Sequence, residues 1–538
     1  MKKASDALQL AYPLSQDHLT ITPPIATGFP MLAKIASFGL CGLEAYPVAI
    51  ETDISPGLPA ITVVGLPDNA VKESRERIRA AIKNSGFEFP AQRITINLAP
   101  ADTKKQGPCY DLAIALGVLA AQGLISVEAL NPFAFLGELS LDGRIQPIQG
   151  ALSIALAAAS SQCRGLVVPF ENAKEAALAG CPVYPARHLN EVIAFLMDPQ
   201  SLNPVKTDFA FLLEKSHLDH LDFSEVKAQQ YLKRGLEIAA AGGHNVIMIG
   251  APGSGKTMLA KRMTTILPDM TPAEVLQTTQ IHSVAGLLKN TEGIISKRPF
   301  RAPHHTASDI AIIGGGNGPR PGEVTLAHNG ILFLDEFLEF NRHVLEVLRQ
   351  PLEDGYVTIA RSKGSLRFPT RFMLIAAMNP CPCGYRDVQG KTCRCSNLQV
   401  EKYRHKISGP LLDRIDIHLH ALPLKTRELV DAPMEESSAT IKERTTKARQ
   451  LQWQRFKGLP VLCNAHMESS HLRNFCALSK EAKEILYHTM EELKFSARAH
   501  DKIIKVARSI GDLAGSETIE AEHIAEAVGY RSLDRATF

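Results

Sequence analysis

The sequence predicts an α/β protein made of two α/β units and a helical C-terminal unit, and three observations support this. Strand-like and helix-like runs alternate over residues 31–198 and again over residues 222–424, a pattern typical of α/β domains. A glycine-rich loop follows the first strand of the second unit. Residues 425–538 carry mostly helical patterns.

Length and composition narrow the class of protein. The 538 residues are enough for several domains, and 45% hydrophobic with 21% charged residues is ordinary globular composition. No apolar run reaches the roughly 18 residues that span a bilayer, and the first residues lack the apolar core of a signal peptide. We therefore expect a cytoplasmic protein whose thiols are reduced or metal-bound. The net charge of +3 permits nucleic-acid binding through local patches.

The first unit follows a short extension. Residues 1–30 have no clear period, and we expect them to form a flexible N-terminal extension. Over 31–198, VAIETDI, ITINLAP and GLVVP predict strands, VKESRERIRAAIKN and QGALSIALAAASSQ predict helices, and the Asp-Gly pair in GELSLDGRI predicts a hairpin. Residues 199–221 are predicted to be a linker.

The second unit opens with a phosphate-binding loop. NVIMIGAPGSGKTMLA combines a strand, the pattern G-x-x-x-x-G-K-T and the start of a helix, which makes this motif specific. Lys256 is expected to reach the β- and γ-phosphates, and the Thr257 hydroxyl to bind Mg²⁺. The predicted nucleotide site contains Gly250, Gly253, Ser254, Gly255, Lys256, Thr257, Met258 and Asp335.

Polar residues that end two later strands predict the rest of the hydrolytic site. In GILFLDEF, Asp335 is expected to hold Mg²⁺ through water and Glu336 to polarise the attacking water. In FMLIAAMNP, Asn379 can orient that water beside the γ-phosphate. His304 and His305 are adjacent, so we do not expect both to bind one metal ion, and we place them on the nucleotide or interface side of the protein.

The order of motifs points to a family. GAPGSGKT, RAPHHTASD, GEVTLAHNGILFLDEF, LRQPLEDG, AAMNPCPCG, SGPLLDRIDIH and SARAHDKIIKVARSIGDL together resemble the magnesium-chelatase-like AAA+ ATPases of the ComM/YifB family. The resemblance implies an ATPase core, a helical lid, and a homo-oligomeric ring, a hexamer, that uses ATP and Mg²⁺. It also implies that Asn379 is sensor 1, Arg414 a finger acting on a neighbouring subunit, and Arg498 sensor 2.

The function implied by this resemblance is that of an ATP-dependent DNA translocase or helicase. It would promote branch migration of recombination intermediates during natural transformation, with single-stranded or branched DNA as partner. The alternative is an ATPase motor subunit of a chelatase-like or protein-remodelling complex. A third possibility, proteolysis, arises because residues 31–198 resemble the Lon-type protease domain. Cys109 stands there at the expected serine and Ile154 at the expected lysine, so we expect an inactive domain.

A predicted hairpin over residues 352–372 precedes the strand that ends at Asn379. In related AAA+ helicases a hairpin at this place projects into the pore of the ring. We therefore expect Arg361 and Lys363, near its tip, to contact DNA phosphates.

Four cysteines follow Asn379 in the spacing C-x-C-x₉-C-x-C. Four thiolates can close a tetrahedral zinc site, so we predict Zn²⁺ bound by Cys381, Cys383, Cys393 and Cys395. Four free thiols or two disulfides are the alternatives. The loop would present the basic residues Arg386, Lys391 and Arg394 to DNA or to a neighbouring subunit.

Overall fold

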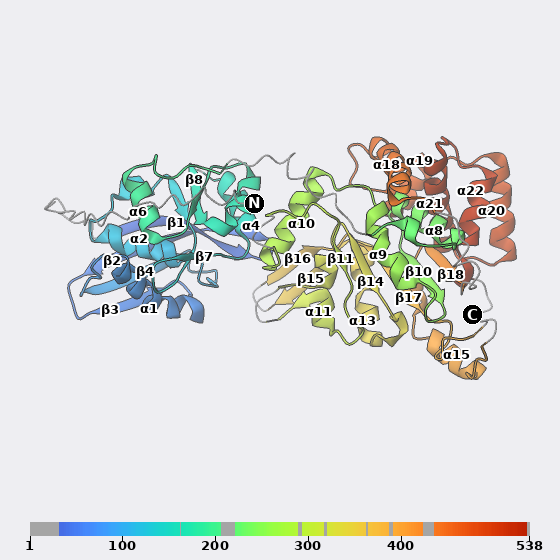
Figure 1. The fold of residues 1–538 in the computed structure, drawn as a ribbon, viewed down its shortest axis with the longest axis horizontal. Helices are drawn as coiled ribbons and strands as arrows, with labels where there is room; N and C mark the ends of the chain where they lie inside the picture. The colour runs from blue at the N-terminus through green and yellow to red at the C-terminus, as the bar shows by residue number, and fades with distance from the viewer. Residues whose placement is uncertain are drawn as a thin grey trace, which may run out of the picture.

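The computed structural model describes residues 32–161, 163–205, 221–288, 293–316, 320–361, 364–386, 391–422 and 435–534. The predicted extension 1–30, most of the predicted linker, and the predicted boundary near residue 425 lie outside these ranges. Figure 1 shows an α/β domain, an α/β core and a helical lid, one after the other along the longest axis. This architecture confirms the predicted fold class, whereas the domain limits stay predictions.

The N-terminal domain contains the following elements in chain order: β1 (Leu32–Cys41), β2 (Glu44–Ser55), β3 (Ala60–Val64), α1 (Asn69–Asn84), β4 (Arg93–Ala99), α2 (Asp111–Ala121), α3 (Val127–Leu130), β5 (Phe133–Phe135), β6 (Glu138–Leu139), β7 (Ile145–Gln146), α4 (Ala151–Ala159), β8 (Gly165–Pro169), η1 (Phe170–Asn172), α5 (Ala173–Ala176), η2 (Ala177–Ala179), β9 (Val183–Ala186) and α6 (Leu189–Met197).

Seven of these strands form one mixed sheet in the order β3-β4-β2-β1-β5-β8-β9. Strand β4 shows why the sequence folds this way, because its alternate residues Ile94, Ile96 and Leu98 are buried against the helices. The predicted Asp-Gly hairpin is the antiparallel pair β6–β7. The predicted strands and helices of this domain are thus confirmed.

The core contains η3 (Phe223–Glu225), α8 (Gln230–Gly242), β10 (Val246–Gly250), α9 (Lys256–Ile266), α10 (Pro272–Val284), β11 (Phe300–Arg301), α11 (Asp309–Ile313), β12 (Gly314–Gly315), β13 (Arg320–Pro321), α12 (Glu323–Leu326), β14 (Ile331–Leu334), η4 (Phe337–Glu339), α13 (Arg342–Val347), α14 (Arg349–Asp354), β15 (Tyr356–Arg361), β16 (Gly364–Pro369), β17 (Met373–Met378), α15 (Asn397–Arg404), α16 (Gly409–Leu412) and β18 (Ile417–Ala421).

The core sheet is parallel throughout and has the strand order β11-β14-β17-β10-β18. Its central strands are buried along their whole length, as expected of a sheet covered on both faces. The carboxyl ends of β10, β14 and β17 meet at one edge, which is where ligands bind in open α/β sheets. The predicted hairpin is the antiparallel pair β15–β16, which precedes β17.

The lid contains α18 (Ser438–Arg455), η5 (Asn464–His466), α19 (Ser469–Phe475), α20 (Lys480–Glu492), α21 (Ala497–Ala514), α22 (Ala521–Gly529) and η6 (Ser532–Asp534). Its apolar side chains are continuous with those of the core, because Leu236 of α8, Leu259 of α9 and Ile503 of α21 belong to one buried cluster. The lid is therefore packed onto the core and is not a separate globule.

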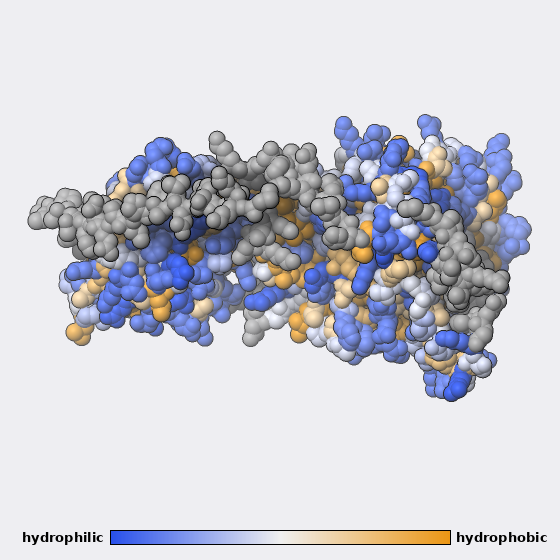
Figure 2. All heavy atoms as spheres, viewed as in Figure 1, coloured by the Kyte–Doolittle hydropathy of each residue, from blue (hydrophilic) through white to orange (hydrophobic). Residues whose placement is uncertain are grey.

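The N-terminal domain contacts the core through α4 and α10, which face each other in Figure 1. The amide of Gly150 donates to the carbonyl of Ser283 at 3.1 Å, and the side-chain amide of Gln280 donates to the carbonyl of Leu43 at 2.8 Å. On the face drawn in Figure 2, hydrophilic residues dominate both ends of the molecule and hydrophobic residues gather over the core in the middle.

Candidate functional site

The phosphate loop connects β10 to α9. Gly253 and Gly255 have φ values of +78° and +84°, in the left-handed region that favours glycine. Helix α9 then begins at Lys256. The backbone amides of the loop and of the first helical turn are therefore close together. A helix N-terminus of this kind attracts phosphate oxygens through its amides and its dipole.

Lys256 lies inside this loop. Its ammonium group donates to the carbonyls of Gly250 at 2.8 Å and Ala251 at 2.9 Å. Burial lowers the pKa of Lys256, and the charge of Asp335 partly offsets that shift. The ammonium group therefore lies at the phosphate loop, and its contact with the phosphates of a nucleotide stays a prediction.

A hydroxyl and a carboxylate meet beside the loop. The Thr257 hydroxyl donates to Asp335 Oδ2 at 2.6 Å, although 78 residues separate them. Oxygen donors of these two kinds are the ligands that Mg²⁺ prefers in proteins, so the pair fits the ion that a bound nucleotide would bring. The ion would neutralise phosphate charge, while Thr257 and Asp335 orient its remaining ligands.

Glu336 follows Asp335 in a left-handed conformation with φ of +51°. The two acids have different partners, because Asp335 contacts Thr257 whereas Glu336 contacts His305. The Glu336 carboxylate is 58% exposed and lies 3.3 Å from His305 Nδ1. The sequence had placed His305 on the nucleotide or interface side of the protein, but its contact with Glu336 was not predicted.

The cysteine loop lies against the phosphate loop. Gly384 has φ of +80°, and a Cβ atom there would lie 2.6 Å from Pro252 Cδ and 3.8 Å from Asn379 Cγ. The cysteine loop therefore packs against both the phosphate loop and Asn379, the predicted sensor 1 residue. Tyr403 of α15 lies near Asn379 and Cys381, and burial raises its pKa to about 12.

The four thiols form a compact cluster. The Sγ atom of Cys381 lies 3.4 Å from that of Cys383 and 3.7 Å from that of Cys393, and the Cys383–Cys393 separation is 3.6 Å. With Cys395 included, all four sulfur atoms lie within 4.8 Å of one another. Four sulfurs around one Zn²⁺, each at about 2.3 Å, lie about 3.8 Å apart, so the cluster fits this ion.

The structure pairs the two predicted arginines with carboxylates. The Arg414 guanidinium forms an ion pair with Glu353 of α14 and donates to the carbonyl of Pro410 at 2.6 Å. Arg498 Nη1 lies 2.8 Å from Asp413 Oδ2. Neither acid belongs to the phosphate loop, and the roles of Arg414 and Arg498 in hydrolysis stay predictions.

The predicted DNA contacts are described only in part. Arg386 Nη1 donates to Asn397 Oδ1 at 3.4 Å, Lys391 Nζ lies 4.3 Å from the centre of the Tyr385 ring, and Arg394 is exposed. The strands β15 and β16 pair up to the hairpin tip. The side chain of Arg361 and the whole of Lys363 lie outside the described residues.

In the N-terminal domain, the residues expected at a protease dyad form no nucleophilic pair. Burial raises the pKa of Cys109 to about 12, which keeps the thiol protonated and unreactive. Ile154 lies in α4 and is 1% exposed within an apolar cluster. A side chain without a proton to exchange cannot act as a base.

A parallel sheet of this order, with a phosphate loop after β10, an acidic pair after β14 and an asparagine after β17, defines a P-loop ATPase of the AAA+ class. The family model described as magnesium chelatase, subunit ChlI, matches residues 222–429. A ChlI model of magnesium chelatase matches residues 50–172, and the model of the C-terminal part of ChlI matches residues 435–531.

Relatives cover nearly the whole chain. It is 44% identical to the uncharacterized protein YifB of Escherichia coli over 502 residues, 92% of this chain and 96% of that protein. It is 41% identical to the competence protein ComM of Haemophilus influenzae over 510 residues, 94% of this chain and 98% of that protein. The chain therefore belongs to the ComM/YifB family of magnesium-chelatase-like AAA+ ATPases.

Two further observations concern the N-terminal domain and membranes. Over 171 residues, or 29% of this chain, the sequence is 28% identical to part of a Lon protease of Flavobacterium johnsoniae. This likeness agrees with the resemblance noted for the N-terminal domain.

Among the described residues, no helix is both long enough and apolar enough to cross a membrane.

Proposed function

We propose that this protein is an ATP-driven DNA translocase that promotes branch migration of recombination intermediates during natural transformation. The observation that carries the proposal is the similarity to competence protein ComM over 98% of that protein's length. The β15–β16 hairpin supports it, because it is inserted directly before the strand that ends at the nucleotide site. A hairpin so placed can pass a nucleotide-dependent movement to a strand of DNA.

The mechanism that we propose uses residues of two subunits in a ring, a hexamer. Lys256 binds the phosphates, Glu336 accepts a proton from the attacking water, and Asn379 orients that water. Arg414 leaves Glu353 and contacts the γ-phosphate of the next subunit, while Arg498 contacts the γ-phosphate of its own. Both guanidiniums would stabilise the charge that develops in the transition state.

DNA would be held by basic groups on the hairpin and on the cysteine loop. Arg361 and Lys363 are proposed at the hairpin tip, and Arg386, Lys391 and Arg394 on the cysteine loop. These side chains would bind phosphates without reading the bases, which suits a motor that moves along any sequence.

This function predicts that single-stranded and branched DNA each stimulate ATP hydrolysis, whereas casein does not. A variant with Arg386, Lys391 and Arg394 replaced by Ala should bind DNA more weakly, and its slope of log affinity against log salt should fall by up to about three units. The matched control replaces three exposed lid cations, Arg473, Lys480 and Lys483.

The measurement is the ATPase rate with each DNA, together with branch migration on a synthetic four-way junction. A rate that no DNA changes would contradict the proposal and favour the alternative, a motor subunit of a chelatase-like or protein-remodelling complex. DNA stimulation with an unchanged salt slope in the triple variant would place the DNA path elsewhere on the protein.

We also propose that Cys381, Cys383, Cys393 and Cys395 bind one Zn²⁺ per chain. The sulfur separations support this proposal, and the metal would fix a loop that is too short to have a core of its own. Replacing Cys393 and Cys395 with Ser should abolish zinc binding and impair DNA-stimulated activity, while nucleotide binding persists.

Elemental analysis of the purified protein tests the zinc prediction. The control is replacement of Cys163 and Cys181, two half-buried thiols of the N-terminal domain, which should leave the zinc content unchanged. Wild-type protein without zinc, or a zinc-free variant with full DNA-stimulated activity, would contradict it.

A further inference from the structure

One face of the lid helix α21 is bonded to the core. Arg498, Lys502 and Ser509 are spaced by four and seven residues, so they share one side of the helix. Each contacts a core residue: Arg498 pairs with Asp413, Lys502 with Asp416, and Ser509 with His244. The lid is thus attached by three polar contacts along a single helix as well as by apolar packing.

Asp416 lies directly before β18 and is 1% exposed. Its Oδ2 atom lies 3.2 Å from His244 Nδ1 and accepts from the amide of Asn245 at 3.2 Å. Burial alone would raise the pKa of Asp416, but Lys502 and His244 outweigh it and hold that pKa well below its usual range. Asp416 therefore faces Lys502 as a buried carboxylate.

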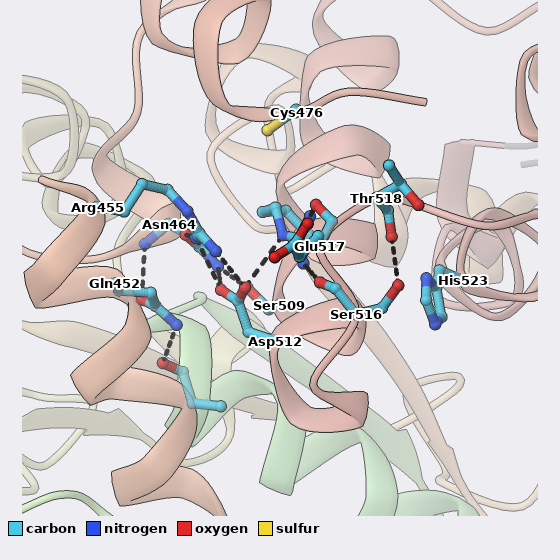
Figure 3. A network of polar contacts seen from close by, with 12 residues as sticks. Gln452, Arg455, Asn464, Cys476, Ser509, Asp512, Ser516, Glu517, Thr518 and His523 are labelled. Atoms are coloured by element: carbon cyan, nitrogen blue, oxygen red, sulfur yellow. Dashed lines mark hydrogen bonds and ion pairs between the residues drawn. The ribbon is translucent and has the colours of Figure 1, made fainter. Parts of the chain in front are cut away.

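The lid side of this attachment is rigid. Asn464 donates from Nδ2 to Ser509 Oγ at 3.0 Å and to Asp512 Oδ2 at 2.8 Å. Asp512 in turn binds Arg455 at 2.9 Å and Arg508 at 3.1 Å, and Figure 3 shows this network around the helix. The network therefore joins α21 to the end of α18 through paired side chains.

The same short core segment carries Arg414. The backbone carbonyl of Arg414 accepts from Asn245 Nδ2 at 2.9 Å. The two acids that bind α21 flank Arg414: Asp413 lies one residue before it and Asp416 two residues after it. The two acids differ in exposure. The Arg498 side chain is 70% exposed and that of Asp413 is 31% exposed, so this ion pair is accessible to exchange, unlike the buried pair of Asp416.

We infer that Asp413 and Asp416 are positioning residues that link the lid helix to the segment bearing Arg414. Asp416 is the fixed attachment, and Asp413 competes with the γ-phosphate of ATP for Arg498. When ATP binds, Arg498 exchanges Asp413 for the phosphate, and the released segment repositions Arg414 toward the neighbouring subunit. This inference rests on the roles proposed above for Arg414 and Arg498.

The test uses Asp413→Asn, which removes the charge and keeps the shape. In full-length protein that carries Glu336→Gln, we expect ATP to bind about 3-fold more tightly, because an exposed ion pair, which contributes little stability, no longer competes for Arg498. ADP affinity should not change, since ADP has no γ-phosphate. In protein that also carries Arg498→Ala, Asp413→Asn should no longer change the affinity for ATP.

Asp269→Asn is the matched control. Asp269 pairs with Lys442 of α18 at 2.6 Å, another ion pair between core and lid, but away from the segment of Arg414. We expect it to leave ATP and ADP affinities unchanged. A second readout is the Hill coefficient of ATP hydrolysis by wild-type and Asp413→Asn rings, which should fall when Asp413 is replaced.

The outcomes separate the inference from the function on which it rests. If Arg498→Ala alone leaves ATP affinity unchanged, the sensor 2 assignment is wrong and the inference fails with it. If Arg498→Ala weakens ATP binding but Asp413→Asn does not tighten it, or shifts ATP and ADP equally, only the inference is overturned. An Asp413→Asn effect that persists without Arg498 also overturns it.

Discussion

Replacing Glu336 with Gln is expected to slow ATP hydrolysis at least about 100-fold while ATP still binds, because the amide cannot accept a proton from water. Glu336 is suited to this role, since it follows the strand beside the phosphate loop and its carboxylate is more than half exposed. Lys256→Ala should instead abolish nucleotide binding, because its ammonium group lies within the loop itself.

Single-turnover hydrolysis and equilibrium ATP binding measure the two effects separately. Glu339→Gln is the control for Glu336, since this acid lies three residues further along and pairs with Lys406 at 3.8 Å. It should hydrolyse ATP at the wild-type rate. Wild-type turnover by Glu336→Gln would show that another group accepts the proton.

Replacing Arg414 with Ala is expected to lower the turnover of the ring by about 1000-fold, the usual loss when such a finger is removed. A finger that acts on the next subunit has a specific consequence. When Arg414→Ala and Lys256→Ala subunits are mixed, some interfaces combine an intact phosphate loop with an intact finger, so activity should partly return.

The measurement is the ATPase rate as a function of mixing ratio. Arg349→Ala is the control, because Arg349 is a nearby cation paired with Glu346 at 3.0 Å and has no proposed role in hydrolysis. It should keep wild-type activity. Failure to recover activity at every mixing ratio would count against a finger that acts between subunits.

The sequence was sufficient wherever chemistry follows local order. The phosphate loop, the acids after β14 and the asparagine after β17 are each fixed by one strand and the residues directly after it. Parallel strands bring their carboxyl ends together, which is why Thr257 and Asp335, both expected to serve one Mg²⁺, lie within hydrogen-bond distance. The cysteine cluster was predictable for a similar reason, because two C-x-C pairs separated by nine residues can meet within one loop.

The remaining contacts depend on packing between distant segments, which a single sequence does not encode in any local pattern. His305 reaches Glu336 because the chain after β11 passes beside β14, and no spacing in the sequence indicates this. The attachment of α21 to Asp416 likewise joins segments 86 residues apart, through a lysine and an aspartate that look ordinary. Such contacts become visible only in the folded chain.

The contact between the N-terminal domain and the core has a consequence for how these sequences can diverge. The amide of Gly150 donates to the carbonyl of Ser283, and the carbonyl of Leu43 accepts from the side-chain amide of Gln280. The carbonyls of Ser283 and Leu43 would persist after substitution of those residues, whereas replacing Gln280 would remove the side-chain donor to Leu43. Two glycines are exceptions: Gly150 has φ of +74° and Gly286 has φ of +70°, and a Cβ atom would lie 2.4 Å from Leu40 Cδ1 at Gly150 and 2.7 Å from Gln149 Nε2 at Gly286. The N-terminal domain can therefore keep its place on the core through changes at residues that contribute only a carbonyl, whereas Gly150, Gly286 and Gln280 are constrained.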